Sequence, residues 1–293
     1  MPARDSSRLE LYSQLMRFNR PVGTLLLLWP TIAALWIASE GIPGISVLLV
    51  FVFGTVTMRA AGCVINDFAD RNIDRHVTRT QNRPLTTGAV SEFEALALFA
   101  GLCTVALILV SLLNRFTLYF SVGGVLIAIA YPFMKRWTYM PQAVLGAAFS
   151  WGILMTFAAV RNEVPPVAWL MFTASLLWII AYDTLLAMVD REDDIKIGIK
   201  STAILFGDAV PWAVMSLQLA TLGLFVLLAQ NLAYSAAFYV ALLVIAALFA
   251  FQQKLIRRAK HPAYFAAFNN NIWVGFTLFV GVVVEETLLP FVA

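Results

Sequence analysis

Long apolar stretches recur along the whole chain, and they constrain its fold more than any other feature. A helix needs about 20 predominantly apolar residues to cross a bilayer. Nine stretches of this kind occur, at 22–39, 45–65, 93–113, 116–134, 141–160, 166–188, 209–228, 233–251 and 271–291. Only 13% of the residues are charged, whereas about a quarter are charged in soluble proteins. The sequence therefore predicts an all-α, polytopic membrane protein with nine spans, and we expect residues 1–293 to form a single membrane-embedded domain.

The basic residues are distributed unequally between the two sides of these spans. Seventeen of the 20 Lys and Arg residues lie in the N-terminal segment or in the loops after the second, fourth, sixth and eighth spans. Of the other three, Arg115 and Arg161 lie in the opposite loops and Arg59 lies within the second span. Because cytoplasmic loops are enriched in Lys and Arg, this pattern predicts a cytoplasmic N-terminus and an outside C-terminus.

The polar segment before the first span has its own helical pattern. Ser7 and Glu10 match a capping box, and Leu11, Leu15 and Phe18 recur at helical spacing over residues 6–19. This pattern predicts an amphipathic helix over residues 6–19, within a segment of residues 1–20 that lies in the cytoplasmic membrane interface. The alternative is a frayed tail.

Two acidic clusters follow even-numbered spans, on the predicted cytoplasmic side. Within each cluster the spacing of four residues would place side chains on one helix face. Carboxylates beside apolar segments are costly without a partner, and oxygen ligands suit Mg²⁺. Two histidines in the whole chain make a zinc or copper site a poor fit. The clusters consist of Asn66, Asp67, Asp70 and Asp74, and of Asp190, Glu192, Asp193 and Asp194.

Two other interpretations of the clusters stay open at this point. The acids could be solvated loop charges paired with the interleaved Arg71, Arg75 and Arg191. They could also belong to the cation or proton pathway of a transporter. Their position at helix ends argues against a transport site at the membrane midplane.

Several basic side chains could complete a diphosphate site beside the acids. Arg83 precedes Pro84, and Lys200 precedes a Ser-Thr pair, so both could offset phosphate charge. Lys135 and Arg136 follow the fourth span, where they could snorkel to the interface; a guanidinium there could also bind a carboxylate. The general enrichment of cytoplasmic loops in basic residues is the competing explanation for all of them.

Taken together, these motifs resemble those of the membrane-embedded aromatic prenyltransferases. The resemblance rests on Asn66-Asp-x-x-Asp70-x-x-x-Asp74 and on Asp190-x-x-x-Asp194. The stretches 190–207 and 131–136 are similar to the bacterial subgroup that acts on 4-hydroxybenzoate in ubiquinone biosynthesis. The resemblance implies nine helices around a central cavity with a lateral opening to lipid. It also implies an active site on the cytoplasmic loops and a location in the bacterial cytoplasmic (inner) membrane.

The resemblance further implies a reaction and roles for individual residues. A polyprenyl group would pass from polyprenyl diphosphate to the carbon of 4-hydroxybenzoate ortho to its hydroxyl; dihydroxynaphthoate and homogentisate are alternative acceptors. Mg²⁺ would be held by Asn66, Asp70, Asp190 and Asp194, with Asp67 and Asp74 as further candidates. The catalytic acids would be Asp70, Asp74, Asp190 and Asp194, with Asp74 a candidate for the base that accepts the ring proton. Arg83, Lys135 and Lys200 would contact the diphosphate, and Arg136 the aromatic carboxylate.

A phosphatidyl-group transferase fits less well. The acidic motif of such enzymes contains Asp-Gly and Gly pairs, which neither acidic cluster has. The two testable alternatives to a prenyltransferase specific for 4-hydroxybenzoate are therefore another aromatic acceptor and a cation-coupled transporter.

Overall fold

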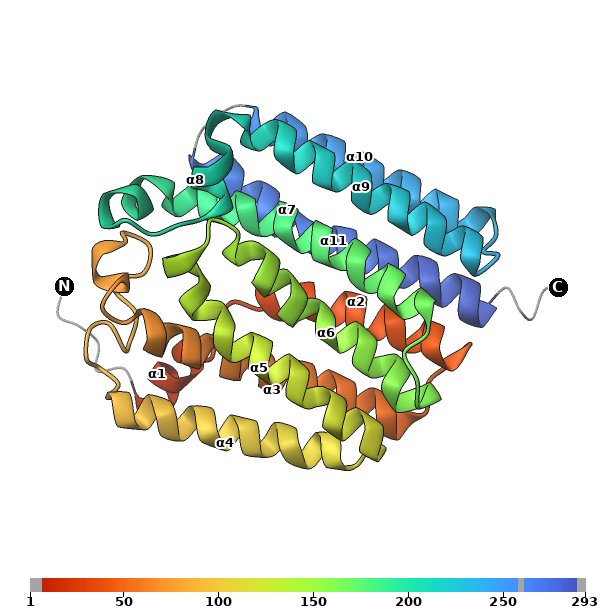
Figure 1. Ribbon diagram of the computed structural model, residues 1–293, viewed down its shortest axis with the longest axis horizontal. Helices are drawn as coiled ribbons and strands as arrows, with labels where there is room; N and C mark the ends of the chain where they lie inside the picture. Colours follow the sequence, from red (N-terminus) through yellow and green to blue (C-terminus); the bar gives the residue numbers. More distant parts are fainter. Residues whose placement is uncertain (1–6, 258–260, 289–293) are drawn as a thin grey trace.

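The structure is a computed structural model that describes residues 7–257 and 261–288. Within these residues nine helices are long and apolar enough to cross a membrane, and no β-strand occurs, which confirms the predicted fold class. The helices lie side by side in one bundle (Figure 1). They are α2 (Val22–Ser39), α3 (Ile45–Asp70), α4 (Glu92–Ser111), α5 (Arg115–Trp137), α6 (Pro141–Arg161), α7 (Pro166–Ile197), α9 (Val210–Asn231), α10 (Ala236–Ile256) and α11 (His261–Val283). Short elements lie between or after these helices: α8 (Thr202–Phe206), the 3-10 turns η1 (Asp74–His76) and η2 (Gly207–Ala209), and the π-helical turn η3 (Val284–Leu288).

Two helices extend beyond the predicted spans and carry the acidic residues with them. Helix α3 runs to Asp70 instead of ending near residue 65, and α7 runs to Ile197 instead of ending near residue 188. The loop after α3 and the end of α7 lie at the same end of the bundle, on the left in Figure 1. The two acidic clusters therefore start from rigid helices at one end of the molecule.

The predicted start of the last span at residue 271 is wrong, because α11 begins ten residues earlier, at His261. Three consecutive asparagines, at 269–271, lie at the predicted start of the span. In the structure they are helical, and two of them have partners inside the bundle. Asn271 accepts a hydrogen bond of 2.8 Å from the indole N–H of Trp178, and Asn270 accepts one of 3.0 Å from Gln252. The predicted end at 291 lies outside the described residues.

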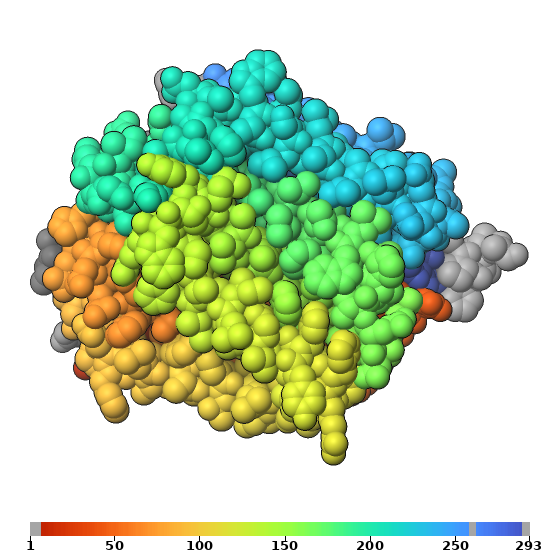
Figure 2. Space-filling model, in the orientation of Figure 1, coloured from red at the N-terminus to blue at the C-terminus, as the bar shows by residue number. Residues whose placement is uncertain are grey.

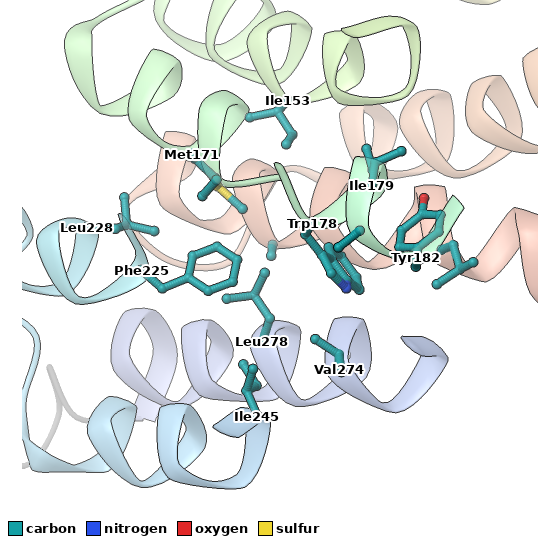
Figure 3. Close-up of a cluster of buried hydrophobic side chains, with 14 of the residues drawn as sticks. Ile153, Met171, Trp178, Ile179, Tyr182, Phe225, Leu228, Ile245, Val274 and Leu278 are labelled. Atoms are coloured by element: carbon teal, nitrogen blue, oxygen red, sulfur yellow. The ribbon is translucent and has the colours of Figure 1, made fainter. Parts of the chain in front are cut away.

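The largest buried apolar cluster joins α2 and α6 to the helices of the second half of the chain. Figure 3 shows Trp178 of α7 among Phe225 of α9, Ile245 of α10 and Leu278 of α11. All four side chains are fully buried, so this half of the bundle is solidly packed. A well-packed core of this kind fixes the position of α7, which carries the second acidic cluster.

Helices α4 and α5 form much of the face seen in Figure 2, in yellow to yellow-green. Their outward side chains are large and apolar: Leu107 is 58% exposed, and Leu126 is 63% exposed. In water such a surface would be unfavourable, whereas in a bilayer it contacts lipid. The chain is therefore a multi-pass membrane protein.

The predicted N-terminal helix is present as α1 (Arg8–Leu15), shorter than the predicted range of 6–19. Its capping box is formed as expected, with the Ser7 hydroxyl accepting from the Glu10 amide at 3.3 Å. Leu15 is fully buried against Val64 and Leu85, so α1 packs onto the end of α3 and the loop that follows it. Helix α1 is thus part of the fold around the acidic end, which the alternative of a frayed tail does not explain.

Candidate active site

A cavity of about 570 Å³ lies within the first half of the bundle, between α2, α3, α4, α5, α6 and α7. Helix α3 lines it along its length, because every fourth residue of one stripe faces it. That stripe is Val50, Gly54, Met58, Gly62 and Asn66. It is apolar over most of its length and polar at Asn66, where the first acidic cluster begins. The cavity therefore joins an apolar track to a charged rim.

Asp67 is buried at this rim and is held by two arginines. Nη2 of Arg17 donates to both carboxylate oxygens at 2.8 Å, and Nη1 of Arg83 donates to Oδ1 at 2.8 Å. Arg83 also reaches Asp74, at 2.7 Å, and so bridges two acids of the cluster. Burial lowers the pKa of Arg17, and the Asp67 carboxylate opposes that shift. The network closes the charged end of the cavity.

The backbone of Arg17 is itself unusual. Its φ of 61° lies in the left-handed region, which strains a non-glycine residue. The guanidinium is anchored by the Gln14 carbonyl at 2.8 Å as well as by Asp67. The turn after α1 thus places this cation at the cavity, a role that the sequence did not reveal.

Asp74 does not share a helix face with Asp70, contrary to the prediction from spacing. Helix α3 ends at Asp70, and Asp74 begins the separate turn η1. The amide of Ile73 donates to the Asp70 carbonyl at 2.8 Å, and this tight turn redirects the chain. Asp74 still reaches the site, because Arg83 binds it. Asp190 and Asp194, in contrast, both lie in α7 with the predicted spacing of one helical turn.

Asp70 pairs with Lys135 at the end of α5. One oxygen of this carboxylate, Oδ1, is buried and has no hydrogen-bond partner within the described part of the chain. Since burial of an unpaired carboxylate oxygen is unfavourable, this atom is suited to bind a cation.

The loop after α3 connects the two acidic clusters. Nε of Arg79 donates to Asp190 at 2.8 Å, Nη2 of the same side chain binds the second oxygen, and the Thr78 amide donates to Asp193 at 2.9 Å. Although desolvation lowers it, the pKa of Arg79 is raised overall by the Asp190 carboxylate. The sequence predicted that the clusters form two halves of one site, and these contacts join them.

Two of the predicted basic residues lie at the edge of the site. Lys200 donates to the Trp137 carbonyl at 3.2 Å, and its amide donates to the Lys135 carbonyl at 3.0 Å. Arg136 is an exposed residue that donates to the Ala69 carbonyl at 2.9 Å, and it does not line the cavity. Its proposed contact with an aromatic carboxylate stays a prediction.

Two charged residues inside the spans line the cavity and were not assigned a role from the sequence. Arg59 lies in α3, and Asp183 lies in α7. The guanidinium of Arg59 contacts Cys63 Sγ at 2.7 Å and lies over the Phe149 ring, while its Nε is buried without a described partner. The signal in the sequence was a charge within an apolar stretch, which usually marks function. Cys63 and Cys103 are free thiols.

The chemistry of the acidic side chains fits Mg²⁺, although their present partners are basic side chains. Among the described residues no three His, Cys, Asp or Glu side chains converge as metal ligands. Asp67, Asp70, Asp74 and Asp190 each pair with Arg or Lys instead. The unpaired Oδ1 of Asp70 and the oxygen-only donor set are those that Mg²⁺ prefers.

Comparisons with known proteins agree with this geometry. The chain is 53% identical to "4-hydroxybenzoate octaprenyltransferase" from Hahella chejuensis, over 97% of this chain and 95% of that protein. Its fold matches a UbiA homologue from Aeropyrum pernix K1 with a TM-score of 0.79 and 26% identity, covering 90% of this chain and 97% of that one. A UbiA homologue from Archaeoglobus fulgidus bound to GPP and Mg²⁺ has the same fold, with a TM-score of 0.69, 19% identity, and coverage of 92% and 99%. Because residues 27–278 match the UbiA prenyltransferase family, the chain belongs to that family.

Proposed function

We propose that this membrane enzyme transfers a polyprenyl group from polyprenyl diphosphate to 4-hydroxybenzoate, at the carbon ortho to the hydroxyl. The observation that carries the proposal is the cavity, which joins an apolar track along α3 to a rim of acids and bases. A polyprenyl diphosphate has the same two parts, an apolar tail and a polyanionic head. Relatives that share more than half of their residues with this chain are named 4-hydroxybenzoate octaprenyltransferases, which supports the choice of acceptor.

The diphosphate would bind where the ion pairs now lie. Asn66, Asp70, Asp190 and Asp194 would hold Mg²⁺, which acts as a Lewis acid on the leaving diphosphate when bound. Arg83, Lys135 and Lys200 would then offset the phosphate charge. Asp67 would have to release two arginines before it could bind Mg²⁺. We therefore propose that its role is to orient Arg17 and Arg83. In this view the cations exchange a carboxylate for a phosphate when the substrate binds.

The acceptor would lie deeper, with its carboxylate on Arg59. This guanidinium is inside the cavity and has no ion-pair partner among the described residues, whereas Arg136 lies outside the cavity. A guanidinium fork suits a carboxylate, and a low dielectric strengthens the pairing. The apolar walls would exclude water from the allylic cation that forms when the bond to diphosphate breaks.

The proposal includes the placement of the protein in the membrane. Residues 1–293 would form one domain in the bacterial cytoplasmic membrane, with the N-terminus and the acidic rim on the cytoplasmic side. Helix α1 would lie in that interface beside the rim. A cation-coupled transporter is the less favoured alternative, because the relatives are named as transferases.

The test is an assay of the purified protein in liposomes with a labelled polyprenyl diphosphate. The acceptors are 4-hydroxybenzoate, dihydroxynaphthoate and homogentisate, each with Mg²⁺ or with a chelator. We expect prenylated 4-hydroxybenzoate and released diphosphate only with Mg²⁺. If another ring is prenylated faster, that ring is the acceptor. If the substrate enters sealed vesicles and no chemical product forms, the protein is a transporter and not an enzyme.

A further inference from the structure

Asp183 has no role in the site described so far, although it is a carboxylate within a membrane span. It lines the cavity from α7, together with Tyr131 and Tyr182. The described ion pairs at the rim involve Asp67, Asp70, Asp74 and Asp190, and none of them reaches Asp183. An ionisable residue inside a span is costly unless it serves a function. Asp183 therefore requires an explanation within the cavity.

Its position relative to the acidic motif on its helix matches that of Arg59. Arg59 precedes Asn66 by seven residues in α3, and Asp183 precedes Asp190 by seven residues in α7. At 1.5 Å per residue, each lies about 10 Å deeper than the acidic cluster on its own helix. Seven residues are close to two turns, so each also lies on nearly the same helix face as that cluster. The cavity thus has a cation and an anion on two different helices, each two turns before the acidic motif of its own helix.

Arg59 and Asp183 do not form an ion pair with each other, although both line the same cavity. Neither charge is neutralised by an ion pair among the described residues, so both are available to a ligand in the cavity. A ring with an anionic group at one end and a hydroxyl at the other would satisfy both. In 4-hydroxybenzoate the carboxylate and the hydroxyl are para to each other, which is this arrangement.

We infer that Asp183 is a catalytic residue that accepts the hydroxyl proton of the phenol and thereby activates the ring carbon for attack. The inference rests on the proposed function, because it assumes an acceptor whose carboxylate lies on Arg59. A proton taken from the oxygen raises the electron density at the ortho carbon, where the new bond forms. Asp74, the base suggested from the sequence, is bound to Arg83 and does not line the cavity.

The step balances without any further reactant. The allylic C1–O bond breaks and its electron pair leaves with the diphosphate. Ring π electrons form the C–C bond at the ortho carbon while the hydroxyl proton passes to Asp183, which gives a dienone. The proton on the substituted ring carbon then leaves to the diphosphate, and Asp183 returns its proton to the oxygen as the ring regains aromaticity. The carboxylate is regenerated, and one proton is released with the diphosphate.

The test compares Asp183→Asn with Asp208→Asn, which makes the same change at a fully exposed carboxylate outside the cavity. Loss of a general base typically lowers turnover by about 100- to 10,000-fold. We expect kcat of D183N to fall in this range, with unchanged Tm and unchanged Kd for the prenyl diphosphate. D208N should behave as the wild type.

A second acceptor separates proton transfer from a loss of shape. The phenol of 3-fluoro-4-hydroxybenzoate is more acidic and keeps one ortho carbon free. D183N lacks the base, and a more acidic phenol needs the base less. The ratio of the wild-type kcat to the D183N kcat should therefore be smaller for the fluorinated acceptor than for 4-hydroxybenzoate. An unchanged ratio of the two rates would overturn the assignment, as would turnover equal to that of D208N or a loss of donor binding.

If D183N does not fold, Asp183→Glu is the alternative variant, because it keeps a carboxylate at this position but displaces it. A displaced carboxylate should lower kcat while the ratio between the two acceptors stays at the wild-type value; a changed ratio would contradict the role as a base. The proposed function is tested separately by the wild type. If the wild type does not prenylate 4-hydroxybenzoate, that function fails, whereas an active D183N removes only the role of Asp183.

Discussion

Replacement of Arg59 by methionine tests the position of the acceptor. Met keeps a long, unbranched side chain but removes the guanidinium. The structure indicates that little else is lost, because the described contacts of Arg59 are Cys63 Sγ at 2.7 Å and the Phe149 ring at 5.7 Å, without an ion pair. A hydrogen bond to a charged group contributes about 1.5 to 3 kcal/mol, which corresponds to about 10- to 150-fold in affinity.

We therefore expect R59M to raise the KM for 4-hydroxybenzoate about 10- to 150-fold, and the KM for the prenyl diphosphate to stay unchanged. The matched control is Arg136→Met, which makes the same change at an exposed guanidinium outside the cavity. The assay measures both KM values in liposomes, with the Kd for 4-hydroxybenzoate determined separately in the absence of donor. An equal loss for the two substrates, or a larger acceptor defect in R136M, would refute the reasoning.

Gly23 offers a perturbation that keeps every charge. A Cβ at this position would lie 2.4 Å from Nη2 of Arg59, so Gly23→Ala must displace the guanidinium. Because a flexible side chain can move at a small cost, the variant should fold and show an acceptor defect smaller than that of R59M. A G23A variant with a normal KM for 4-hydroxybenzoate would show that the exact position of the guanidinium does not matter.

The remaining predictions concern the rim and the fold. Asp70→Asn and Asp190→Asn should abolish turnover while the protein still inserts, because each removes a carboxylate that would hold Mg²⁺ at the rim; turnover in either purified variant would contradict the proposed metal site. Arg161→Ala should lower the Tm, because its guanidinium donates to two carbonyls at the end of α2 at 2.9 Å, and such bonds contribute about 1.5 to 3 kcal/mol. The control is Arg115→Ala, an exposed arginine on the same side of the bundle, and an equal Tm for the two variants would contradict that assignment.

The sequence predicted the spans well and their ends less well, for identifiable reasons. No glycine or proline follows Asp70 that would mark the end of α3, so the i, i+4, i+8 spacing was extended one turn too far, to Asp74. Helix α11 was predicted too short because the polar asparagines at 269–271 interrupt the apolar pattern on which the span was based. Their partners, such as Trp178, come from other helices and cannot be identified from local sequence.

The site could be predicted in composition but not in its connections. The acids and most of the bases at the rim were identified from spacing and charge. Arg17 was not, because its contact with Asp67 joins residues 50 positions apart through a strained turn. Arg59 and Asp183 were visible as charges in apolar stretches, yet nothing local showed that both line one cavity.

From its sequence alone, the chain was predicted to have nine membrane spans, to place most of its basic residues on one side, and to carry two acidic motifs at helix ends. These properties depend on composition and on helical periodicity, which are local. Tertiary structure decided which cation pairs with which acid and which charges share the cavity, because such contacts depend on how the helices are rotated and positioned against one another. Packing sets those positions. For example, a Cβ added to Gly123 or Gly124 of α5 would lie 2.6 Å from the Trp151 indole of α6, so the two helices can approach this closely only because both residues are glycines.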